Sequence, residues 1–344
     1  MKTVTWKNNR VVMIDQNKLP NELEYVTCAS VQEVAKAIKE MKVRGAPAIG
    51  VTAALGLALA AFNSNAINRQ EFIKDLERAA KIITSTRPTA VNLFWAAQSI
   101  LKEANSIEGS PEEIREAVIR KALAIAEEDV KINRKIGEFG ANLIQDGDTI
   151  GTVCNAGWLA TAGEYGTALS PIKVAHEQGK KVNVIAMETR PKLQGARLTA
   201  YELMNDGIPV EVIVDGALGY CMSRGMIDKF ICGADRIIVK SGGHVANKIG
   251  TYMASVLAER HEVPFFVAAP LSTFDFSKDL SELVIEERNK NEIGIINGRW
   301  IVPVEAKVFN PAFDITPPNL VKAFITEKGV IFPPFRERLN KLNF

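Results

Sequence analysis

Beyond residue 145, short apolar segments alternate with helical segments, and this pattern constrains the fold more than any other feature of the chain. The apolar segments lack the polar alternation of strands with one face in solvent. Such strands, separated by helices, form a parallel sheet that helices cover on both faces. The predicted strands are TIGTVCN, VNVIAMET, VEVIVDG, FICGADRIIV and VPFFVAAP; the predicted helices are PIKVAHEQG, GARLTAYELMNDG, a short one near Met222 and VANKIGTYMASVLAERH. We therefore predict a doubly wound α/β domain over residues 146–344.

The residues before this pattern predict a smaller, mainly helical domain over residues 1–145. The segment TVTWKNNRVVMI has β-forming residues on both sides of a polar turn, so we expect the domain to start with a β hairpin. From Ser30, which has the chemistry of a helix N-cap, helical segments follow to about Phe139. Arg87 and Pro88 interrupt that run with an extended segment.

Charge and cysteine content exclude several classes of protein. The formal net charge of +2 on 344 residues gives no basic footprint, so we expect no nucleic-acid partner. Residues 45–62 carry no charge, but they are rich in Ala and Gly and contain Pro47, so we predict a buried helix and no membrane segment. Four cysteines without close pairing favour reduced thiols and a cytoplasmic protein. They are Cys28, Cys154, Cys221 and Cys232.

Polar residues follow the predicted strands at the point where each strand ends. Ligands of open α/β sheets bind beyond the carboxyl ends of the strands, so we expect these residues to surround a small molecule. They are Cys154-Asn155, Glu188-Thr189-Arg190, Asp215 and Asp235-Arg236.

The residues alone leave two interpretations open for Cys154 and for Asp235. Cys154 is either a buried apolar thiol or a site residue, since the small-residue loop NAGWLATAGEYG after it could approach an anion closely. Asp235 is either a partly desolvated acid suited to proton donation or the partner of Arg236 or a helix cap. The loop has neither a dinucleotide nor a P-loop signature, so we expect no cofactor of those kinds.

Other polar residues have the chemistry of phosphate ligands. Asn247 and Lys248 lie at the start of a predicted helix, and Arg44 and Arg87 lie in proline-containing turns, RGAPAIG and STRPTAVNL. The alternative is that these side chains are simply solvated. The three histidines form no metal-binding pattern, so we predict metal-free acid–base chemistry.

Taken together, these segments resemble the methylthioribose-1-phosphate isomerase family, within the superfamily of the regulatory subunits of translation initiation factor 2B. The resemblance extends from about residue 44 to 330, and two departures are the extra Glu164 and the segment VKSGGHVANKIG. The segments that carry it are RGAPAIG, RPTAVNL, GTVCNAGWLATAGEYGTAL, ETRPKLQGARLTA, GADRI, VANKIGTY, VPFFVAAPLSTFD, IEER and NPAFDITP.

The resemblance implies a Rossmann-like C-terminal domain and a homodimeric enzyme of methionine salvage that needs no cofactor. Such an enzyme converts 5-methylthioribose 1-phosphate into 5-methylthioribulose 1-phosphate. By the resemblance, Asp235 is the general acid and Cys154 assists catalysis. The substrate-binding residues that it implies are Arg44, Gly45, Ala46, Arg87, Gln194, Asn247 and Lys248. Two alternatives stay open: an isomerase of ribose 1,5-bisphosphate, and a non-enzymatic regulatory subunit.

Overall fold

The computed structural model describes residues 1–87, 91–296 and 298–341, and these group into two compact units. The first unit contains Met1–Arg134 and Ala156–Gly166, and the second contains Lys135–Asn155 and Thr167–Phe344. The chain therefore returns to the first unit directly after Asn155. That residues 1–145 and 146–344 are separate domains stays a prediction.

The first unit opens with the predicted hairpin. Its two strands are joined by Asn8 and Asn9, which have φ of 50° and 55°. A two-residue turn with positive φ at both positions matches the twist of a hairpin, and asparagine tolerates this backbone. A third strand completes an antiparallel sheet of order β1-β2-β3. The strands are β1 Val4–Lys7, β2 Arg10–Ile14 and β3 Tyr25–Cys28.

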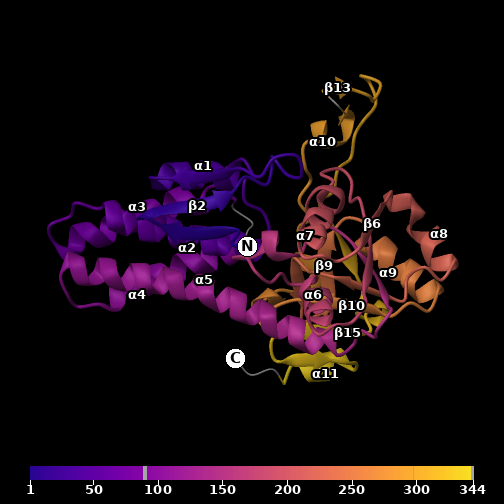
Figure 1. The fold of residues 1–344 in the computed structure, drawn as a ribbon. Coiled ribbons are helices and arrows are strands. Elements are labelled where there is room, and N and C mark those ends of the chain that lie inside the picture. Colours follow the sequence, from indigo (N-terminus) through magenta and orange to yellow (C-terminus); the bar gives the residue numbers. More distant parts are fainter. Residues whose placement is uncertain (88–90, 297, 342–344) are drawn as a thin grey trace. The chain divides into compact units, whose positions relative to one another are not determined.

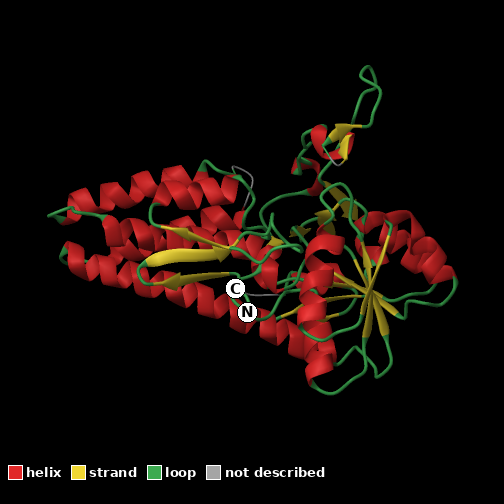
Figure 2. Cartoon of the chain, turned by 45° about the horizontal axis from the view of Figure 1, so that its top comes forward, coloured by secondary structure: helices red, strands yellow, loops and turns green. Residues whose placement is uncertain are grey.

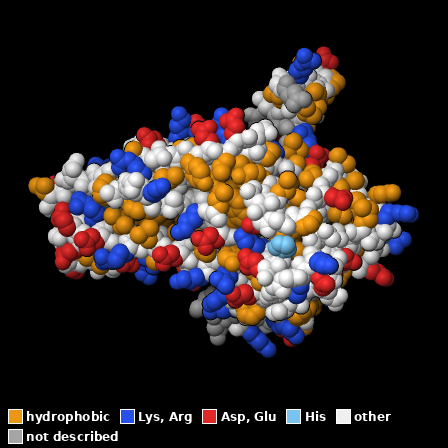
Figure 3. Space-filling model, in the orientation of Figure 1, with side chains coloured by type: hydrophobic (Ala, Val, Ile, Leu, Met, Phe, Trp, Pro, Cys, Tyr) orange, Lys and Arg blue, Asp and Glu red, His pale blue; other side chains and the backbone are white. Residues whose placement is uncertain are grey.

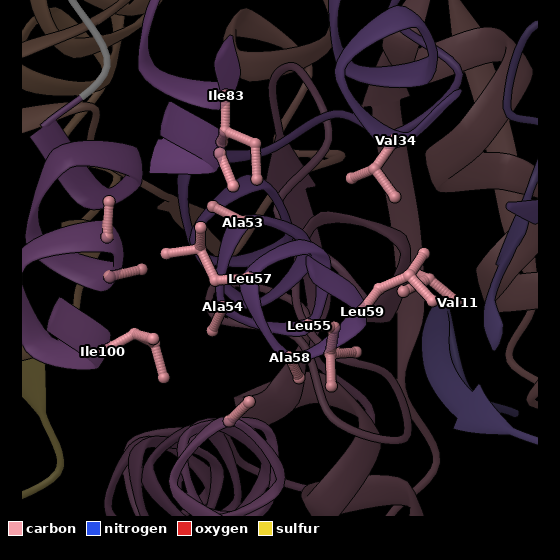
Figure 4. Packing of buried hydrophobic residues seen from close by; sticks show 14 of the residues in the cluster. Val11, Val34, Ala53, Ala54, Leu55, Leu57, Ala58, Leu59, Ile83 and Ile100 are labelled. Carbon is pink, nitrogen blue, oxygen red and sulfur yellow. The ribbon is translucent and has the colours of Figure 1, made fainter. Parts of the chain in front are cut away.

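The helix α2, Ala46–Asn63, forms the core of the first unit. Leu55, Leu57 and Leu59 are buried and point in different directions: Leu59 toward Val11, and Leu57 to the opposite side of the helix, where Ile83 and Ile100 lie (Figure 4). A helix that is apolar on every side needs partners on every side. The partners are α1 Val31–Lys39, α3 Arg69–Thr84 and α4 Val91–Ser106. The next helix, α5 Pro111–Ala141, starts in the first unit and belongs to the second unit from Lys135 onward.

Among the described residues, α2 alone is long and apolar enough to cross a membrane by length and composition. However, 72% of its apolar window is buried inside the protein. The prediction of a buried helix over residues 45–62 is therefore confirmed, because a core helix passes the same test of hydropathy.

The second unit is built on a sheet of seven described strands in the order β16-β15-β10-β7-β4-β5-β6. All neighbours are parallel except β15 and β16. Numbered along the chain, the six parallel strands have the order 3-2-1-4-5-6 of a doubly wound sheet. The predicted fold class is confirmed (Figure 2). The strands are β4 Thr149–Thr152, β5 Asn183–Met187, β6 Val210–Ile213, β7 Lys229–Cys232, β10 Phe265–Ala268, β15 Ala323–Thr326 and β16 Gly329–Ile331.

Helices cover both faces of this sheet (Figure 1). On one face α6 packs against the end of α5, where Gly137 and Gly140 leave room for Ser170 and Pro171. On the other face α8 packs against α9. The helices are α6 Ser170–Glu177, α7 Ala200–Asn205, α8 Leu218–Ser223, α9 Thr251–Arg260 and α11 Phe335–Leu339. Short helical turns are η1 Trp158–Ala160, η2 Gly195–Thr199, η3 Asp215–Ala217, η4 Leu271–Thr273, η5 Leu280–Glu282 and η6 Pro318–Leu320.

A second, smaller sheet of order β11-β8-β9-β14 lies between β7 and the end of the chain in sequence. Beyond it, residues 283–296 and 298–309 belong to a protruding arm with exposed hydrophobic side chains (Figure 3). The strands are β8 Arg236–Ile238, β9 His244–Lys248, β11 Phe274–Asp275 and β14 Phe313–Thr316, and the arm carries α10 Asn291–Gly294, β12 Ile295–Ile296 and β13 Arg299–Trp300.

The prediction that Asn247 and Lys248 start a helix is wrong. They end β9, and the helix α9 begins only at Thr251. β9 pairs with β8 on one side and with β14 on the other. Two hydrogen-bonded neighbours outweigh the helix propensity of a short Ala-Asn-Lys run, because propensity is a weak effect.

Candidate functional site

Cys154 and Asp235 follow two strands that are neighbours in the sheet. β4 and β7 are parallel, with Gly151 opposite Phe230, so both residues lie beyond the carboxyl ends of adjacent strands. The next strand after β4 in sequence, β5, lies on the other side of β4. The strand order therefore reverses between β4 and β7, which is where open α/β sheets bind their ligands.

Cys154 is half-buried and has a left-handed backbone, with φ of 64°. Its backbone N–H donates to the Thr189 hydroxyl at 2.8 Å. Its carbonyl accepts a hydrogen bond from the Thr199 hydroxyl at 2.7 Å. Two threonine side chains from different segments thus hold the two backbone polar groups of this cysteine.

Thr189 is itself held by Asp215, which follows the next strand of the sheet. The carboxylate of Asp215 accepts hydrogen bonds from the backbone N–H groups of Thr189 and Arg190, both at 2.8 Å. The Thr189 hydroxyl donates its hydrogen to the Met187 carbonyl at 3.0 Å, while its oxygen accepts the hydrogen bond from the Cys154 N–H. Asp215, predicted as a strand-end residue, therefore binds backbone at the end of β5.

Thr199 has a second polar neighbour in Asn155. The Asn155 amide donates to the Thr199 hydroxyl at 3.2 Å and to the Glu202 carboxylate at 2.7 Å. Glu202 is buried. The residue after Cys154 is therefore anchored to the π-helical turn η2 and to α7.

Asp235 is exposed in the single chain, which corrects the expectation of a partly desolvated carboxylate. The reason is that β7 ends at Cys232, so Asp235 lies in the connection to β8 and not against the apolar strand. Its backbone N–H donates to the Ala246 carbonyl at 2.9 Å. Arg236 forms an ion pair with Asp275 at 3.4 Å.

Asn247 and Lys248 are buried at the end of β9. The Asn247 amide donates to the Thr251 hydroxyl at 3.0 Å, and that hydroxyl donates to the Lys248 carbonyl at 2.6 Å. In the sheet, Asn247 lies opposite Asp314 of β14. These bonds fix the turn that joins β9 to α9.

Asp314 is a half-buried carboxylate that was not among the predicted site residues. Burial raises the pKa of Asp314 to about 6, although the backbone N–H groups of Tyr252 and Gly250 and the charge of Lys248 all lower it. A carboxyl with this pKa changes its charge close to neutral pH. Its place in the segment NPAFDITP was the only sequence signal for it.

The thiols differ in burial. Cys154 is half-buried, whereas Cys28, Cys221 and Cys232 are buried, and all four are free of disulfides. Burial raises the pKa of the Cys232 thiol, and the nearby Asp314 and Cys154 raise it further. Cys232 is thus a protonated structural thiol close to the site. Among the described residues no group of His, Cys, Asp and Glu could hold a metal ion.

Gln194 is buried and directly precedes the turn η2 that carries Thr199. Arg197 lies in the same turn, and burial lowers the pKa of its guanidinium. Gln194 therefore belongs to the same stretch of chain that contacts Cys154 and Asn155. No local sequence pattern links Thr189 and Thr199 to Cys154, because these hydrogen bonds join residues 35 and 45 positions apart.

Four predicted site residues belong to the first unit. Gly45 is the N-cap of α2, with Ala46 as the first helical residue and Arg44 half-buried before it. Arg87 is half-buried after α3, and Pro88, Thr89 and Ala90 of the segment RPTAVNL lie outside the described residues. A Cβ atom on Gly45 would lie 2.4 Å from the carbonyl oxygen of Ala160, so only glycine fits there.

The loop after Cys154 does not offer the predicted anion cradle over residues 160–165. All six backbone N–H groups donate within the chain, among them Ala162 to the Asp129 carboxylate at 2.7 Å and Glu164 to the Met1 carbonyl at 2.8 Å. A backbone N–H that is already bonded has no hydrogen left for a phosphate.

Comparisons with known proteins agree with the resemblance found in the sequence. The chain is 52% identical to the methylthioribose-1-phosphate isomerase of Thermosipho africanus, covering 99% of this chain and 97% of that protein. It is 46% identical to the crystal structure of 5-methylthioribose 1-phosphate isomerase from Pyrococcus horikoshii, with a TM-score of 0.94 and coverage of 99% and 95%.

A third relative carries a different description. The crystal structure described as the translation initiation factor eIF-2B, subunit delta, from A. fulgidus is 49% identical, with a TM-score of 0.91 and coverage of 99% and 98%. The sequence model of the Initiation factor 2 subunit family matches residues 42–333. The chain belongs to the Initiation factor 2 subunit family and, within it, to the methylthioribose-1-phosphate isomerases.

Proposed function

We propose that this protein is an aldose–ketose isomerase that converts 5-methylthioribose 1-phosphate into 5-methylthioribulose 1-phosphate in methionine salvage. Identity of about half over the full length with relatives of that name supports the activity. The structural observation that carries the proposal is the position of Cys154 and Asp235 beyond adjacent parallel strands, where the strand order reverses.

The substrate requires an acid at the start of the reaction. With a phosphate ester on C1, the sugar ring cannot open to a free aldehyde by itself. A proton must reach the ring oxygen as the ring opens, and Asp235 is the proposed donor. Its exposure in the single chain means that bound substrate must provide the desolvation that favours a protonated carboxyl.

Hydrogen must then move from C2 to C1, and two routes do this. In the first, a base removes the C2 proton through an enolate-like intermediate, and Cys154 is the proposed base. In the second, hydride moves directly and Cys154 contributes to a water-poor cavity. The half-buried position of Cys154 beside the apolar core of the second unit is compatible with both.

The proposed ligands of the sugar and its phosphate are the residues that the family resemblance implies. Asn247 and Lys248 are supported by their burial at the end of β9, and Gln194 by its position before η2. For the residues of the first unit the resemblance is the sole support: they are Arg44, Gly45, Ala46 and Arg87. We propose that no metal or cofactor takes part.

A coupled assay with purified protein tests the function. We expect turnover of 5-methylthioribose 1-phosphate and at least about a hundredfold preference over ribose 1,5-bisphosphate, because the second phosphate replaces an apolar methylthio group. Asp235→Asn should abolish turnover while substrate still raises the melting temperature. Cys154→Ser should lower kcat by about two orders of magnitude. Unimpaired turnover by Asp235→Asn would refute the acid role.

A second candidate function is that of a non-enzymatic regulatory subunit. The observation in its favour is the description of the 49% identical A. fulgidus structure as an initiation factor subunit. The same assay separates the two: a subunit of that kind would show no turnover of either sugar phosphate at any enzyme concentration.

We also propose that the protein is a cytoplasmic homodimer. Apolar side chains on the outer surfaces of α8 and α9 support a contact between two copies: Tyr220, Tyr252, Met253 and Val256 are all exposed. Light scattering on the purified protein should give twice the mass of 37.7 kDa. Tyr220→Glu should shift it toward the monomer, because a buried interface excludes an unpaired charge.

A further inference from the structure

We infer that Thr189 and Thr199 are positioning residues that hold Cys154 in its reactive orientation, and that Asp215 fixes Thr189 for this purpose. The inference rests on the proposed function, since it assigns these residues a role toward the proposed catalytic thiol. The two hydroxyls bind the N–H and the carbonyl of Cys154 itself, at 2.8 Å and 2.7 Å.

The backbone at this place needs such support. Cys154 and Thr189 both have φ of 64°, a conformation that side chains of L-residues rarely adopt. For a β-branched residue such as Thr189 it is a true outlier, and strained backbone persists only where the surrounding contacts determine it. Both residues have such contacts: Thr189 and Thr199 bind the backbone of Cys154, and Asp215 binds the backbone of Thr189.

The hydrogen bonds run across the ends of three neighbouring strands. Cys154 follows β4, Thr189 follows β5 and Asp215 follows β6, and these strands are parallel neighbours in that order. The Asp215 side chain binds the backbone of Thr189, and the Thr189 side chain binds the backbone of Cys154. A rigid sheet edge thus determines where the Cys154 backbone lies.

This arrangement limits the direction of the thiol. The backbone fixes the Cα–Cβ bond of Cys154, and its single side-chain torsion then leaves only a few staggered positions for the sulfur. Loss of either hydroxyl removes one hydrogen bond from the Cys154 backbone and allows that backbone to leave the left-handed region. A misplacement of a reacting group by about 1 Å can lower a rate by about a hundredfold.

Valine and serine variants separate the hydroxyl from the shape of the side chain. Thr189→Val and Thr199→Val keep the volume and lose the hydroxyl, and we expect each to lower kcat by about 10- to 100-fold with KM within about threefold of wild type. Thr189→Ser and Thr199→Ser keep the hydroxyl and should recover most of the rate. Asp215→Asn, whose amide keeps one acceptor oxygen, should lower kcat by a smaller factor.

Thr316→Val is the matched control. Thr316 is buried in the same unit, and its hydroxyl has no hydrogen-bond partner among the described residues. Its replacement by valine removes a buried hydroxyl without such a partner, so kcat and KM should stay at wild-type values and the melting temperature should not fall. A fall in kcat in this control equal to that of Thr189→Val would show a general effect of buried valine and overturn the inference.

Thiol labelling gives a readout that does not depend on turnover. Cys154 is the half-buried thiol and the other three are buried, so iodoacetamide should label Cys154 first, as mapped by mass spectrometry. We expect Thr189→Val and Thr199→Val to change this rate at least fivefold and the serine variants to restore it. Unchanged labelling and unchanged kcat in both valine variants would overturn the inference. Full activity of Cys154→Ser would instead overturn the proposed role of the thiol in catalysis. The labelling rates of the threonine variants would still show whether Thr189 and Thr199 position Cys154.

Should a valine variant fail to fold, as judged by circular dichroism, the serine variants and Asp215→Asn still decide the question. The inference requires that iodoacetamide label Cys154 at the wild-type rate in the serine variants and at a different rate in Asp215→Asn. A changed labelling rate in the serine variants together with an unchanged rate in Asp215→Asn contradicts it.

Discussion

Gly250 donates its backbone N–H to the Asp314 carboxylate at 2.7 Å, and Tyr252 donates to the same carboxylate at 3.0 Å. Asp314 thereby holds the start of α9 against β14, and with it the turn that follows Asn247 and Lys248. The Asp314 carboxylate also interacts with the charge of the Lys248 ammonium, which lowers the pKa of Asp314. One side chain therefore determines both the position and the electrostatic surroundings of two proposed substrate ligands.

Asp314→Ala should weaken substrate binding more than it slows chemistry. We expect KM to rise by about tenfold and kcat to change by less than about threefold, because a lost cap costs a helix about 1 kcal/mol. Steady-state kinetics measure the split. Asp279→Ala is the control. It removes the cap of the exposed turn η5, which carries no proposed substrate ligand, and should leave KM and kcat unchanged. A fall in kcat at constant KM would contradict this role.

Acid should also weaken binding through Asp314. Its pKa is about 6, so below that pH the carboxyl becomes neutral and loses its attraction for Lys248. The substrate phosphate titrates in the same range, so the comparison must be between wild type and Asp314→Asn. We expect the ratio of their KM values to fall toward one between pH 7.5 and pH 5. A ratio that does not vary with pH would contradict the prediction.

Asp129 should make the folded state more stable in mild acid. Burial raises the pKa of Asp129 to about 6, above its ordinary value, although the Ala162 N–H and Asn133 lower it. Between pH 6 and pH 4 the folded protein therefore binds a proton that the unfolded chain does not bind. Ionisation of this group at higher pH lowers the free energy of unfolding by at most about 3 kcal/mol.

Asp129→Asn removes this titration while its amide oxygen can still accept from Ala162. The difference in free energy of unfolding between wild type and Asp129→Asn should therefore shift in favour of wild type as the pH falls from 7 to 4. Urea denaturation at a series of pH values measures it. Parallel curves for the two proteins would show that Asp129 does not titrate in this range.

Gly45→Ala should destabilise the protein by about 3 kcal/mol. The substitution strains a backbone with φ of 89° and places a Cβ atom 2.4 Å from the Ala160 carbonyl oxygen. Gly147→Ala is the control, since Gly147 has the same φ of 89° and nothing within 4 Å of the added atom. It should cost about 1 kcal/mol, the strain alone. If chemical denaturation gives equal losses in the free energy of unfolding for Gly45→Ala and Gly147→Ala, the overlap with Ala160 is ruled out as a cause.

Deuterium at C2 of the substrate should distinguish the two routes of hydrogen transfer. If Cys154 acts as a base, part of the label exchanges with solvent before it reaches C1, because a thiol shares its protons with water. If hydride moves directly, C1 of the product retains all of the label. Proton NMR of the product in H₂O gives the retained fraction. Full exchange together with full activity of Cys154→Ser would contradict both proposed roles of the thiol.

The sequence predicted the features that periodicity and local chemistry determine. Uniformly apolar segments such as VPFFVAAP predicted parallel strands correctly, and the Asn8-Asn9 turn predicted the hairpin. Cys154 and Asp235, which the sequence places after two predicted strands, follow strands that are neighbours in the sheet, although their shared role in one site stays a prediction. Local patterns failed for Asn247 and Lys248, where sheet pairing on both sides outweighs propensity.

Contacts between distant residues could not be predicted in this way. Nothing in the residues around Thr189 indicates that its hydroxyl accepts from Cys154, and nothing around Asp314 indicates that it binds the start of α9. The exposure of Asp235 followed from the early end of β7 at Cys232, since FICGADRIIV contains a break that its apolar composition conceals. The roles proposed for Arg44, Arg87 and Gln194 still depend on the family resemblance.

The return of Ala156–Gly166 to the first unit bears on how the chain is made. Thr3 donates to the Trp158 carbonyl and Gln16 to the Leu159 carbonyl, so some of the earliest residues bind partners about 150 positions later. While the ribosome is still adding those later residues, Thr3 and Gln16 have no access to these acceptors. The first unit can finish folding only after Ala156–Gly166 has been synthesised, so truncated products that stop before residue 166 should be substrates for proteolysis.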